Sequence, residues 1–303
     1  MRIGVIGAGA MGGLFGTRLA TAGHDVAFIE VSRPAIDAIR THGLQLLIGD
    51  EDVRIWPEIG EASDFTDPFE LLMIFTKGFH TAQAIEDVRH LLTPATWVLS
   101  VQNGLGNAEL IAGVVKPERI IVGTTDFPSQ LLAPGCVSSH GRGCVRIWSH
   151  TGEAVERVMT IAAAFDDAGL TCTAEPQVQV SIWEKLAFNA ALNSICSVTG
   201  LTVGKLGQSP SGKRTVAAVV GEAVSVAQAM GVNASKARIT AAIDNAFAHH
   251  TSHKPSMLQD IEAGRRTEND FIAGAVVRMG LANQVPVPVT QTLHALVQMK
   301  DQR

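Results

Sequence analysis

The sequence predicts an α/β protein in which a doubly wound, mostly parallel sheet is followed by an all-helical C-terminal domain. In the N-terminal part, β-like apolar runs alternate with helical stretches, which is the pattern of a parallel sheet covered by helices. After Pro176 the pattern is helical, with hardly any β-like alternation. The chain of 303 residues is also longer than one hydrophobic core comfortably grows. We therefore expect two domains, residues 1–174 and 175–303.

The first elements form a βαβ unit. Arg2 to Ile6 is a short apolar run, Met11 to Ala22 has a helical pattern, and Asp25 to Val31 reads as a second strand. Two parallel strands joined by a helix require a right-handed crossover. Further strands are expected at 71–76, 97–101 and 119–124, with helices at 81–91 and 107–115 between them.

The end of the N-terminal domain is expected to be a hairpin, a helix and a strand. Cys136 to Ser139 and Cys144 to Trp148 flank Gly141-Arg142-Gly143, which predicts a hairpin that extends the sheet in the antiparallel sense. A helix at 153–168 and a strand at 170–174 then complete the domain. The helices expected in the second domain span 180–198, 216–230, 236–249, 256–263, 268–279 and 289–299.

Composition and charge exclude several classes of protein. The net charge is −5, and Arg265-Arg266 is the longest basic cluster, so no nucleic-acid surface is expected. No run of about 18 uninterrupted apolar residues occurs, which predicts no membrane span. The four cysteines have neither the spacing of a zinc site nor the density of a disulfide scaffold. They favour a reducing, cytoplasmic setting and predict no metal centre.

A glycine-rich loop, Gly7-Ala8-Gly9-Ala10-Met11-Gly12, follows the first strand and opens the first helix. In this G-x-G-x-x-G pattern the first Gly permits a tight turn, the second lets a pyrophosphate approach the backbone, and the third lets helix and strand pack closely. The helix N-terminus supplies the anion site. The alternative is a glycine-rich helix that merely packs on the sheet, but the position within a βαβ unit favours dinucleotide binding.

Glu30 lies at the end of the second strand, where an acid would hydrogen-bond the adenosine ribose and repel a 2′-phosphate. It favours NAD(H). Two alternatives stay open: Glu30 is only a solvated strand end, or Arg33 turns back to hold the 2′-phosphate of NADP(H).

Two more polar residues follow predicted strands. Lys77 comes after Phe75-Thr76, and Asn103 after Gln102. In open α/β sheets, ligands bind at the carboxyl ends of the strands, so both are candidate ligands of a cofactor. Lys77 could instead be a solvated strand terminus, and Asn103-Gly104 only a turn.

A polar stripe runs along the predicted helix at 180–198. Lys185, Asn189 and Asn193 are spaced by four, so they lie one above the other on a helix, with Ser181 and Ser197 extending the line. Amides and one ammonium, on a helix that is otherwise apolar, indicate the wall of a site. The alternative is a partly exposed helix with a sparse polar edge.

Two further segments carry candidate site residues. Ser256 follows Pro255 as a plausible N-cap, and Thr267 is expected to begin another helix with Glu268 in its first turn. Helix capping and the helix dipole would be a sufficient explanation for both residues.

Taken together, these segments resemble the ketopantoate reductase (2-dehydropantoate 2-reductase) family over nearly the whole chain. Members of that family have a Rossmann domain followed by an all-helical domain, with the active site in the cleft between them. They reduce the 2-keto acid ketopantoate to D-pantoate with NADPH, for coenzyme A synthesis. The segments that carry the resemblance are the glycine loop, Thr76-Lys77, Gln102-Asn103-Gly104, Trp183-Glu184-Lys185-Leu186 with Asn189 and Asn193, Ser256 to Asp260, Gly264-Arg265 and Thr267-Glu268.

The resemblance implies a role for each candidate residue. A proton donor must stand near the keto oxygen, since hydride transfer leaves negative charge there. Lys185 is similar to the general acid of the family, and Glu268 would orient Lys185 or hold the nicotinamide ribose. The substrate would be bound by Asn103, which also bridges to the cofactor, and by Asn189, Asn193 and Ser256.

One departure from the family leaves the cofactor and the substrate open. The family pattern has an Arg just after the second strand for the NADP phosphate, whereas Glu30 comes first here and Arg33 is displaced. NADP(H) by resemblance and NAD(H) by Glu30 are therefore both retained, and the local sequence favours NAD(H). The rival functions are an NAD-dependent D-2-hydroxy-acid dehydrogenase for branched or aromatic 2-keto acids, and a non-catalytic dinucleotide sensor. A homodimer is compatible with a helical second domain, although no patch in the sequence identifies its contact face.

Overall fold

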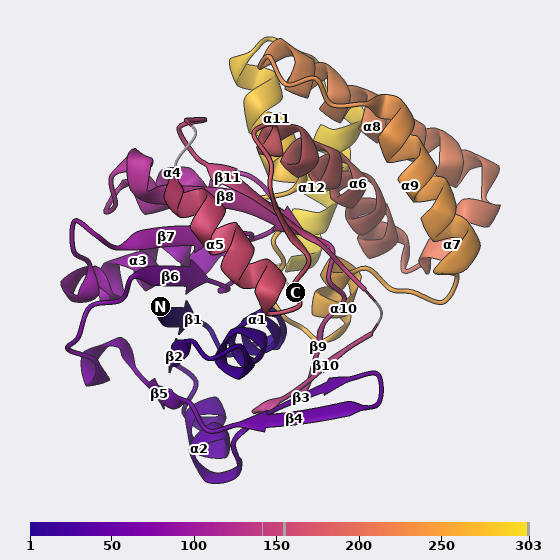
Figure 1. Ribbon diagram of the computed structural model, residues 1–303. Helices are drawn as coiled ribbons and strands as arrows, with labels where there is room; N and C mark the ends of the chain where they lie inside the picture. The colour runs from indigo at the N-terminus through magenta and orange to yellow at the C-terminus, as the bar shows by residue number, and fades with distance from the viewer. Residues whose placement is uncertain (141, 154–155, 302–303) are drawn as a thin grey trace. The chain divides into compact units, whose positions relative to one another are not determined.

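A computed structural model describes residues 1–140, 142–153 and 156–301 (Figure 1). The chain divides into two compact units, and the division is not a single cut in the sequence. The first unit consists of Met1–Gln102 and Asn107–Val178, and the second of Asn103–Gly106 and Gln179–Arg303. The short segment at 103–106 thus belongs to the helical unit although its neighbours in the chain belong to the other.

The first unit is built on an eight-stranded sheet with the order β12-β11-β8-β7-β6-β1-β2-β5. From β1 the chain adds β2 and β5 on one side and β6, β7 and β8 on the other, so the topology reverses beside β1. Neighbouring strands are parallel except that β11 runs antiparallel to β8. The predicted doubly wound sheet is confirmed. Its strands are β1 Arg2–Ile6, β2 Asp25–Ile29, β5 Glu58–Gly60, β6 Leu71–Ile74, β7 Trp97–Ser100, β8 Ile120–Thr125, β11 Val145–Ser149 and β12 Cys172–Ala174.

The central strands are buried on both faces. All four residues of β6 and all four of β7 are buried, which is the pattern of parallel strands inside an α/β unit. Helix α1 contacts β2, and helix α5 contacts β11 and β12. The helices of this unit, with 3-10 helices labelled η, are α1 Ala10–Thr21, α2 Arg33–His42, η1 Ala62–Asp64, η2 Gly78–His80, α3 Thr81–Asp87, η3 Arg89–Leu91, α4 Asn107–Ala112, η4 Pro117–Arg119 and α5 Glu156–Asp167.

A second, four-stranded sheet was not predicted. It has the order β4-β3-β10-β9, with β3 Leu44–Ile48, β4 Glu51–Ile55, β9 Gln130–Ala133 and β10 Cys136–Ser139. Helix α1 contacts its strands as well as β2. A Cβ added at Gly13 would lie 2.7 Å from Val137 Cγ2, so the absence of a side chain on α1 is what lets β10 approach this closely.

The predicted hairpin of 136–139 with 144–148 is wrong. β10 pairs with β3 and β9 in the small sheet, whereas β11 pairs with β8 and β12 in the large one. Gly143, before β11, packs on Phe127, since a Cβ at Gly143 would lie 2.5 Å from Phe127 Cα. The antiparallel addition of β11 to the large sheet was predicted correctly. Gly141 of the expected turn, like residues 154 and 155 of the expected helix, lies outside the described residues.

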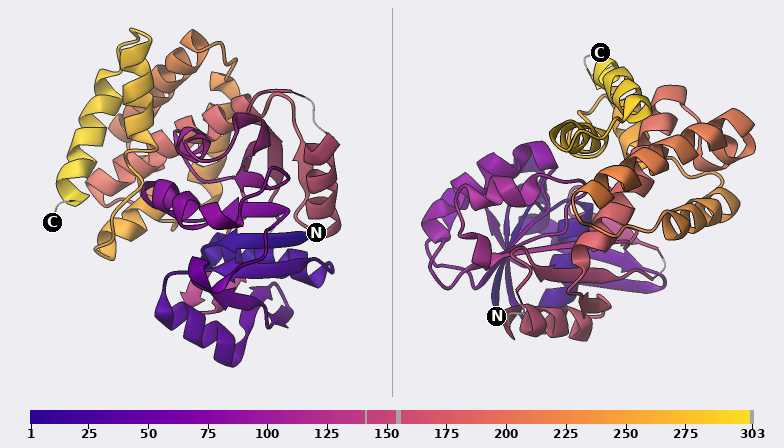
Figure 2. Two further views of the ribbon diagram at one scale, coloured as in Figure 1. Left: turned by 90° about the vertical axis from the view of Figure 1, so that its left-hand side faces the viewer. Right: turned by 90° about the horizontal axis from the view of Figure 1, so that it is seen from above.

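The regular elements in the described part of the second unit are all helices (Figure 2). Helix α6 supplies buried Leu186, Ala190 and Ile195 to its core, which the apolar sides of the other helices complete. Helix α8 contacts α7, α9, α11 and α12. The helices are α6 Val178–Thr199, α7 Val203–Gln208, α8 Pro210–Ala229, α9 Lys236–His249, α10 Ser256–Glu262, α11 Ala273–Ala282 and α12 Pro288–Asp301.

Charged side chains satisfy two helix ends inside this unit. Lys300 Nζ donates to the carbonyls of Ser197 and Val198 at 2.7 and 2.9 Å, at the C-terminus of α6. The Glu222 carboxylate on α8 accepts from the amides of Val289 and Thr290 at 2.9 and 2.8 Å, at the N-terminus of α12. Both charges have the sign that the helix dipole favours.

Two predictions about helix starts are wrong. The N-cap of α10 is Pro255, whose carbonyl accepts from Gln259 N at 3.1 Å, so Ser256 is the first helical residue and not the cap. Glu268 lies in a turn before α11, which begins only at Ala273. Thr267, which was expected to begin that helix, instead donates through its N and Oγ1 to the Asp301 carboxylate.

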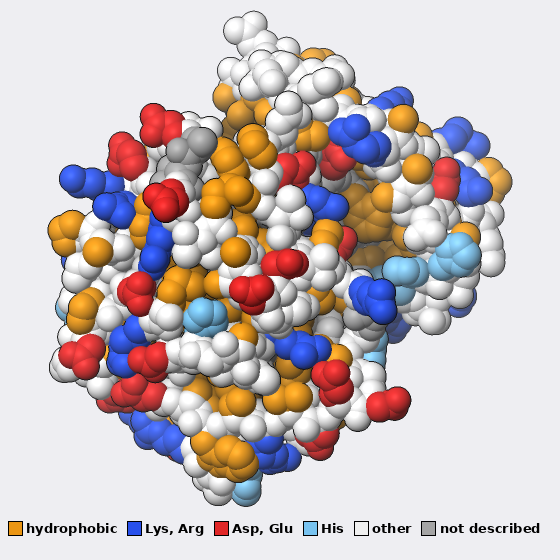
Figure 3. All heavy atoms as spheres, viewed as in Figure 1, with side chains coloured by type: hydrophobic (Ala, Val, Ile, Leu, Met, Phe, Trp, Pro, Cys, Tyr) orange, Lys and Arg blue, Asp and Glu red, His pale blue; other side chains and the backbone are white. Residues whose placement is uncertain are grey.

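The described surface carries mixed charge. On the face in Figure 3, basic and acidic side chains are interspersed and do not gather by sign. Within the described ranges no helix is both long and apolar enough to cross a membrane. The same residues contain no group of three or more His, Cys, Asp or Glu side chains placed to hold a metal ion.

Candidate active site

The glycine loop adopts the geometry that its sequence predicts. Gly7 has a φ of +100°, which a residue with a side chain rarely adopts. A Cβ at Gly12 would lie 1.9 Å from Gly7 O, so only glycine fits where α1 passes the strand. At Gly9, the N-cap of α1, an added Cβ would meet no protein atom within 4 Å. The loop is therefore tight on the protein side and open on the other.

Glu30 is bound to this loop. Its Oε2 accepts from Ala8 N at 2.7 Å, and its Oε1 accepts from Val31 N and Ser32 N at 2.9 and 2.8 Å. A carboxylate offers about four acceptor positions. Three backbone donors thus fix the orientation of Glu30 and leave it capacity for a further hydroxyl.

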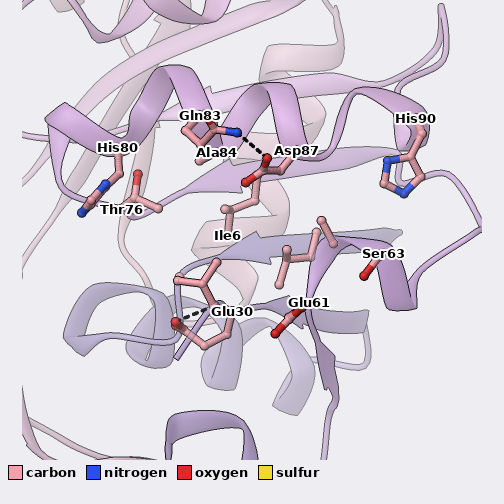
Figure 4. A pocket seen from close by; sticks show the side chains of 14 residues that line it. Ile6, Glu30, Glu61, Ser63, Thr76, His80, Gln83, Ala84, Asp87 and His90 are labelled. Atoms are coloured by element: carbon pink, nitrogen blue, oxygen red, sulfur yellow. Dashed lines mark hydrogen bonds between the residues drawn. The ribbon is translucent and has the colours of Figure 1, made fainter. Parts of the chain in front are cut away.

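A pocket of about 530 Å³ opens beside the loop, at the carboxyl ends of β1, β2 and β6 (Figure 4). This is the point where the strand order reverses, which is the expected ligand site of such a sheet. Glu30, Glu61 and Ser63 line one side in Figure 4, and His80, Gln83 and Asp87 lie across from them. Among the described residues that line it there are three carboxylates, those of Glu30, Glu61 and Asp87, and no Lys or Arg.

Arg33, the alternative candidate for a 2′-phosphate ligand, is paired with an acid of the pocket. Its guanidinium Nη2 lies 2.9 Å from Glu61 Oε1. Val31, two residues before Arg33, lines the pocket and has 78% of its surface exposed. The position directly after Glu30 therefore presents an apolar side chain to the pocket.

Gln102 fastens the ends of β6 and β7 to each other, a role that the sequence analysis missed. Its Nε2 donates to Thr76 O at 2.7 Å and to Thr81 Oγ1 at 2.9 Å, and its Oε1 accepts from Ser100 Oγ at 2.8 Å. Thr76 lines the pocket, and Lys77 follows as the N-cap of η2. The position of Gln102 next to Asn103 was a signal that could have identified it.

In the second unit, α6 carries the polar stripe as predicted. Lys185 and Asn189 are partly buried, and Asn193 is buried. The rotation of α6 is fixed by its neighbours: Trp183 is buried in the core, and Glu184 Oε1 accepts from Ser235 N at 2.8 Å. The stripe therefore has one defined orientation within the helical unit.

The segment that carries Asn103 packs on the turn that carries Glu268. Leu105 N donates to Phe271 O at 2.9 Å, and a Cβ at Gly104 would lie 2.2 Å from the same oxygen. Gly104 has a φ of +87°. Two segments that are far apart in the sequence, each with a predicted site residue, are thus joined by their backbones inside the second unit.

The Glu268 turn is anchored by its neighbours in the chain. Thr267 Oγ1 donates to Asp301 Oδ2 at 2.6 Å, and Asn269 Nδ2 donates to His294 O at 2.9 Å, both on α12. Thr267, Glu268 and Asn269 are all buried. Ser256, by contrast, is exposed on the first turn of α10.

The loop and the pocket fit a dinucleotide. The open space at Gly9 and the N-terminus of α1 suit a pyrophosphate, and the fixed Glu30 carboxylate suits ribose hydroxyls. The fold and this site together are those of a dinucleotide-binding protein of the α/β class, with a helical second domain.

Comparison with known proteins identifies the particular family. Residues 3–152 match the family model described as ketopantoate reductase PanE/ApbA. Residues 177–301 match the family model described as ketopantoate reductase PanE/ApbA C terminal. The chain belongs to the ketopantoate reductase family.

Similarity to individual members extends over the full length. The 2-dehydropantoate 2-reductase of Halobacterium salinarum is 32% identical over 300 residues, covering 99% of this chain and 98% of that protein. The enzyme of the same name from Streptococcus pyogenes serotype M3 is 30% identical over 302 residues, with the same coverage. The structure of a D-mandelate dehydrogenase with NADH and anilino(oxo)acetate is similar with a TM-score of 0.94 and 30% identity, covering 100% of this chain and 99% of that one.

Proposed function

We propose that the protein is an oxidoreductase that reduces ketopantoate to D-pantoate with a nicotinamide dinucleotide, as a 2-dehydropantoate 2-reductase does. The observation that supports this most is the family match in both halves, residues 3–152 and 177–301. Relatives with that name align along the full length of the chain. The glycine loop and the adjoining pocket supply the cofactor site that this reaction requires.

Bound NADH or NADPH would supply the hydride that reduces the keto carbon. The carbon–oxygen π bond then opens towards oxygen, which takes up a proton. We assign that proton to the Lys185 ammonium as general acid, after which the neutral amine regains a proton from water. Glu268, held in its buried turn by the anchors at Thr267 and Asn269, would orient Lys185 or bind the nicotinamide ribose.

Substrate binding is assigned to neutral side chains. Asn189 and Asn193 share the helix face of Lys185, and their amides can hold hydroxyl and carboxylate oxygens without competing for the proton. Asn103 is joined through its segment to the Glu268 turn and would bridge cofactor and substrate. Ser256 would bind the substrate carboxylate from the start of α10.

For the cofactor we propose NAD(H). The support is the pocket, whose described lining holds three carboxylates and no Lys or Arg. A 2′-phosphate of NADP(H) would enter negative surroundings, whereas two ribose hydroxyls could donate to Glu30. Lys77, at the carboxyl end of β6, would contact the dinucleotide from the next strand.

The test is a steady-state comparison of NADH with NADPH at saturating ketopantoate, with Lys185→Ala as the diagnostic variant. Loss of a positioned acid should lower kcat by about 10²- to 10⁴-fold and leave the dissociation constant for NADH unchanged. Lys213→Ala, which removes an exposed lysine on α8, is the matched control and should behave as wild type. A Lys185→Ala protein with wild-type kcat would exclude Lys185 as the acid.

A second candidate function is an NAD-dependent D-2-hydroxy-acid dehydrogenase for bulkier 2-keto acids. The observation that favours it is the similarity to the D-mandelate dehydrogenase structure with NADH, together with the acidic pocket. A higher kcat/KM for phenylglyoxylate than for ketopantoate would select this function. If a broad panel of 2-keto acids gave no turnover while NADH still bound, the protein would be a dinucleotide sensor.

The homodimer and the cytoplasmic location stay predictions. The homodimer can be tested by light scattering.

A further inference from the structure

Glu61 lies beside Glu30 in the cofactor pocket because of how two strands pair. β5 runs parallel to β2 with Gly60 opposite Ile29, and Glu30 N donates to Gly60 O at 2.8 Å. Glu61 directly follows Gly60, as Glu30 follows Ile29. Figure 4 shows both carboxylates on the same side of the pocket. Whatever sits against Glu30 must therefore also face Glu61.

Glu61 is held in place from two directions. It forms a capping box with Asp64 at the start of η1, in which Glu61 N donates to Asp64 Oδ2 at 3.0 Å. Its own carboxylate lies 2.9 Å from Arg33 Nη2. A second arginine of α2, Arg40, pairs with Asp64 at 3.6 Å. Glu61 thus joins the pocket wall to the first residue of α2.

Arg33 is the basic residue closest in the sequence to the end of β2. The 2′-phosphate on the adenosine ribose of NADP(H) would lie at that end of the strand. We propose that Glu61 is a second determinant of cofactor choice, which excludes NADP(H) by engaging Arg33 and by adding its own charge to the pocket. This inference rests on the proposed dinucleotide site. Glu30 recognises the ribose hydroxyls, whereas Glu61 controls whether a guanidinium is available to a phosphate.

The Arg33–Glu61 ion pair is exposed, so either residue can be replaced without disturbing the core. The side chains of Arg33 and Glu61 retain 64% and 38% of their accessible surface, and exposed ion pairs are weak. Removing Glu61 should therefore cost little stability, while a released arginine can form a charge-assisted pair with a phosphate. Loss of one repulsive charge and gain of one attractive charge should raise affinity for NADP⁺ by about tenfold.

The experiment measures binding of NAD⁺ and NADP⁺ to the full chain by titration calorimetry. Glu61→Gln should strengthen NADP⁺ binding about tenfold with NAD⁺ binding unchanged. Arg33→Ala alone should weaken NADP⁺ binding and leave NAD⁺ binding unchanged, because it leaves the Glu61 charge in the pocket uncompensated. In the double variant Glu61→Gln/Arg33→Ala the gain should disappear. Arg40→Ala breaks the other ion pair of α2 with this turn and the hydrogen bonds of Arg40 to Ile59 O. It is the control for removal of a basic side chain from α2, and it should leave the ratio of NADP⁺ to NAD⁺ affinity unchanged.

Two results would overturn the inference. The first is an unchanged ratio of NADP⁺ to NAD⁺ affinity in Glu61→Gln, and the second is a gain that persists in the double variant. Should Glu61→Gln fail to fold, Glu61→Ser, which keeps an N-cap side chain, carries the same expectations. Failure of the proposed dinucleotide site would look different, since the wild-type protein would then bind neither dinucleotide. Failure of the proposed reaction would appear as absent turnover with the dinucleotide affinities unchanged.

Discussion

Replacing Gly12 by Ala tests the glycine loop directly. The added Cβ would lie 1.9 Å from Gly7 O and 3.1 Å from Gly7 C, and real Cβ atoms are essentially never found within 3.0 Å of another heavy atom. The obstacle is backbone and cannot rotate away. The helix and the loop must therefore separate by at least about 1 Å, at the place where we propose that the pyrophosphate binds.

The magnitude follows from two opposing effects on stability and one on binding. Overpacking costs about 1–3 kcal/mol, and Ala in a helix interior recovers about 1 kcal/mol relative to Gly. We expect the free energy of unfolding to fall by roughly 0–2 kcal/mol. A displacement of about 1 Å breaks a backbone hydrogen bond to the charged pyrophosphate, which contributes about 1.5–3 kcal/mol. The dissociation constant for NADH should therefore rise by about 10- to 100-fold.

NADH fluorescence titration and urea unfolding measure the two quantities. Gly9→Ala is the informative partner, because its Cβ meets no protein atom within 4 Å but would occupy the space of the pyrophosphate. It should keep wild-type stability and lose NADH affinity. Gly221→Ala on α8, whose nearest atom is Lys236 Nζ at 3.8 Å, is the neutral control. If Gly12→Ala binds NADH like wild type, or Gly9→Ala like Gly221→Ala, the loop does not hold the pyrophosphate.

Three further predictions concern the scaffold. Glu222→Ala should lower the free energy of unfolding by about 2–3 kcal/mol in urea titration, since it strips the amides at the start of α12 of a charged acceptor; unchanged stability would mean that water replaces the carboxylate. Asn269→Ala should cost about 1–3 kcal/mol and lower kcat by loosening the Glu268 turn, whereas Gln291→Ala, which truncates an exposed side chain on the same helix as the His294 acceptor, should leave kcat unaltered. Burial raises the pKa of the Cys172 and Cys196 thiols to about 12, so at pH 8 both are protonated and should resist iodoacetamide until urea unfolds the chain, as peptide mass spectrometry can show.

The first βαβ unit could be predicted because its signals are local. The apolar run of β1, the glycine spacing and the acid at Glu30 lie within about thirty residues, the size of such a unit, and each dictates its own conformation. The stripe of Lys185, Asn189 and Asn193 was found for the same reason, since a spacing of four fixes the face of a helix.

The errors arose where distant segments decide the outcome. β10 and β11 are neighbours in the sequence, yet β10 packs on α1 through Val137 and Gly13, and nothing local indicates that partner. The β3–β4 hairpin, by contrast, has a local signal of a turn, because Gly49-Asp50 lies between its two strands. The role of Glu61 could not be predicted, because it depends on the pairing of β5 with β2.

Because of the segment at 103–106, the helical unit is not formed by one continuous stretch of sequence. Leu105 leaves the ribosome roughly 170 residues before its partner Phe271, about 10–30 s at ordinary rates of synthesis. The turn of Glu268 can therefore complete its contacts only after nearly the entire chain has been made. A fragment that begins at Gln179 would leave Phe271 O without its amide donor, so the helical half cannot be cut out and studied as it stands in the whole protein.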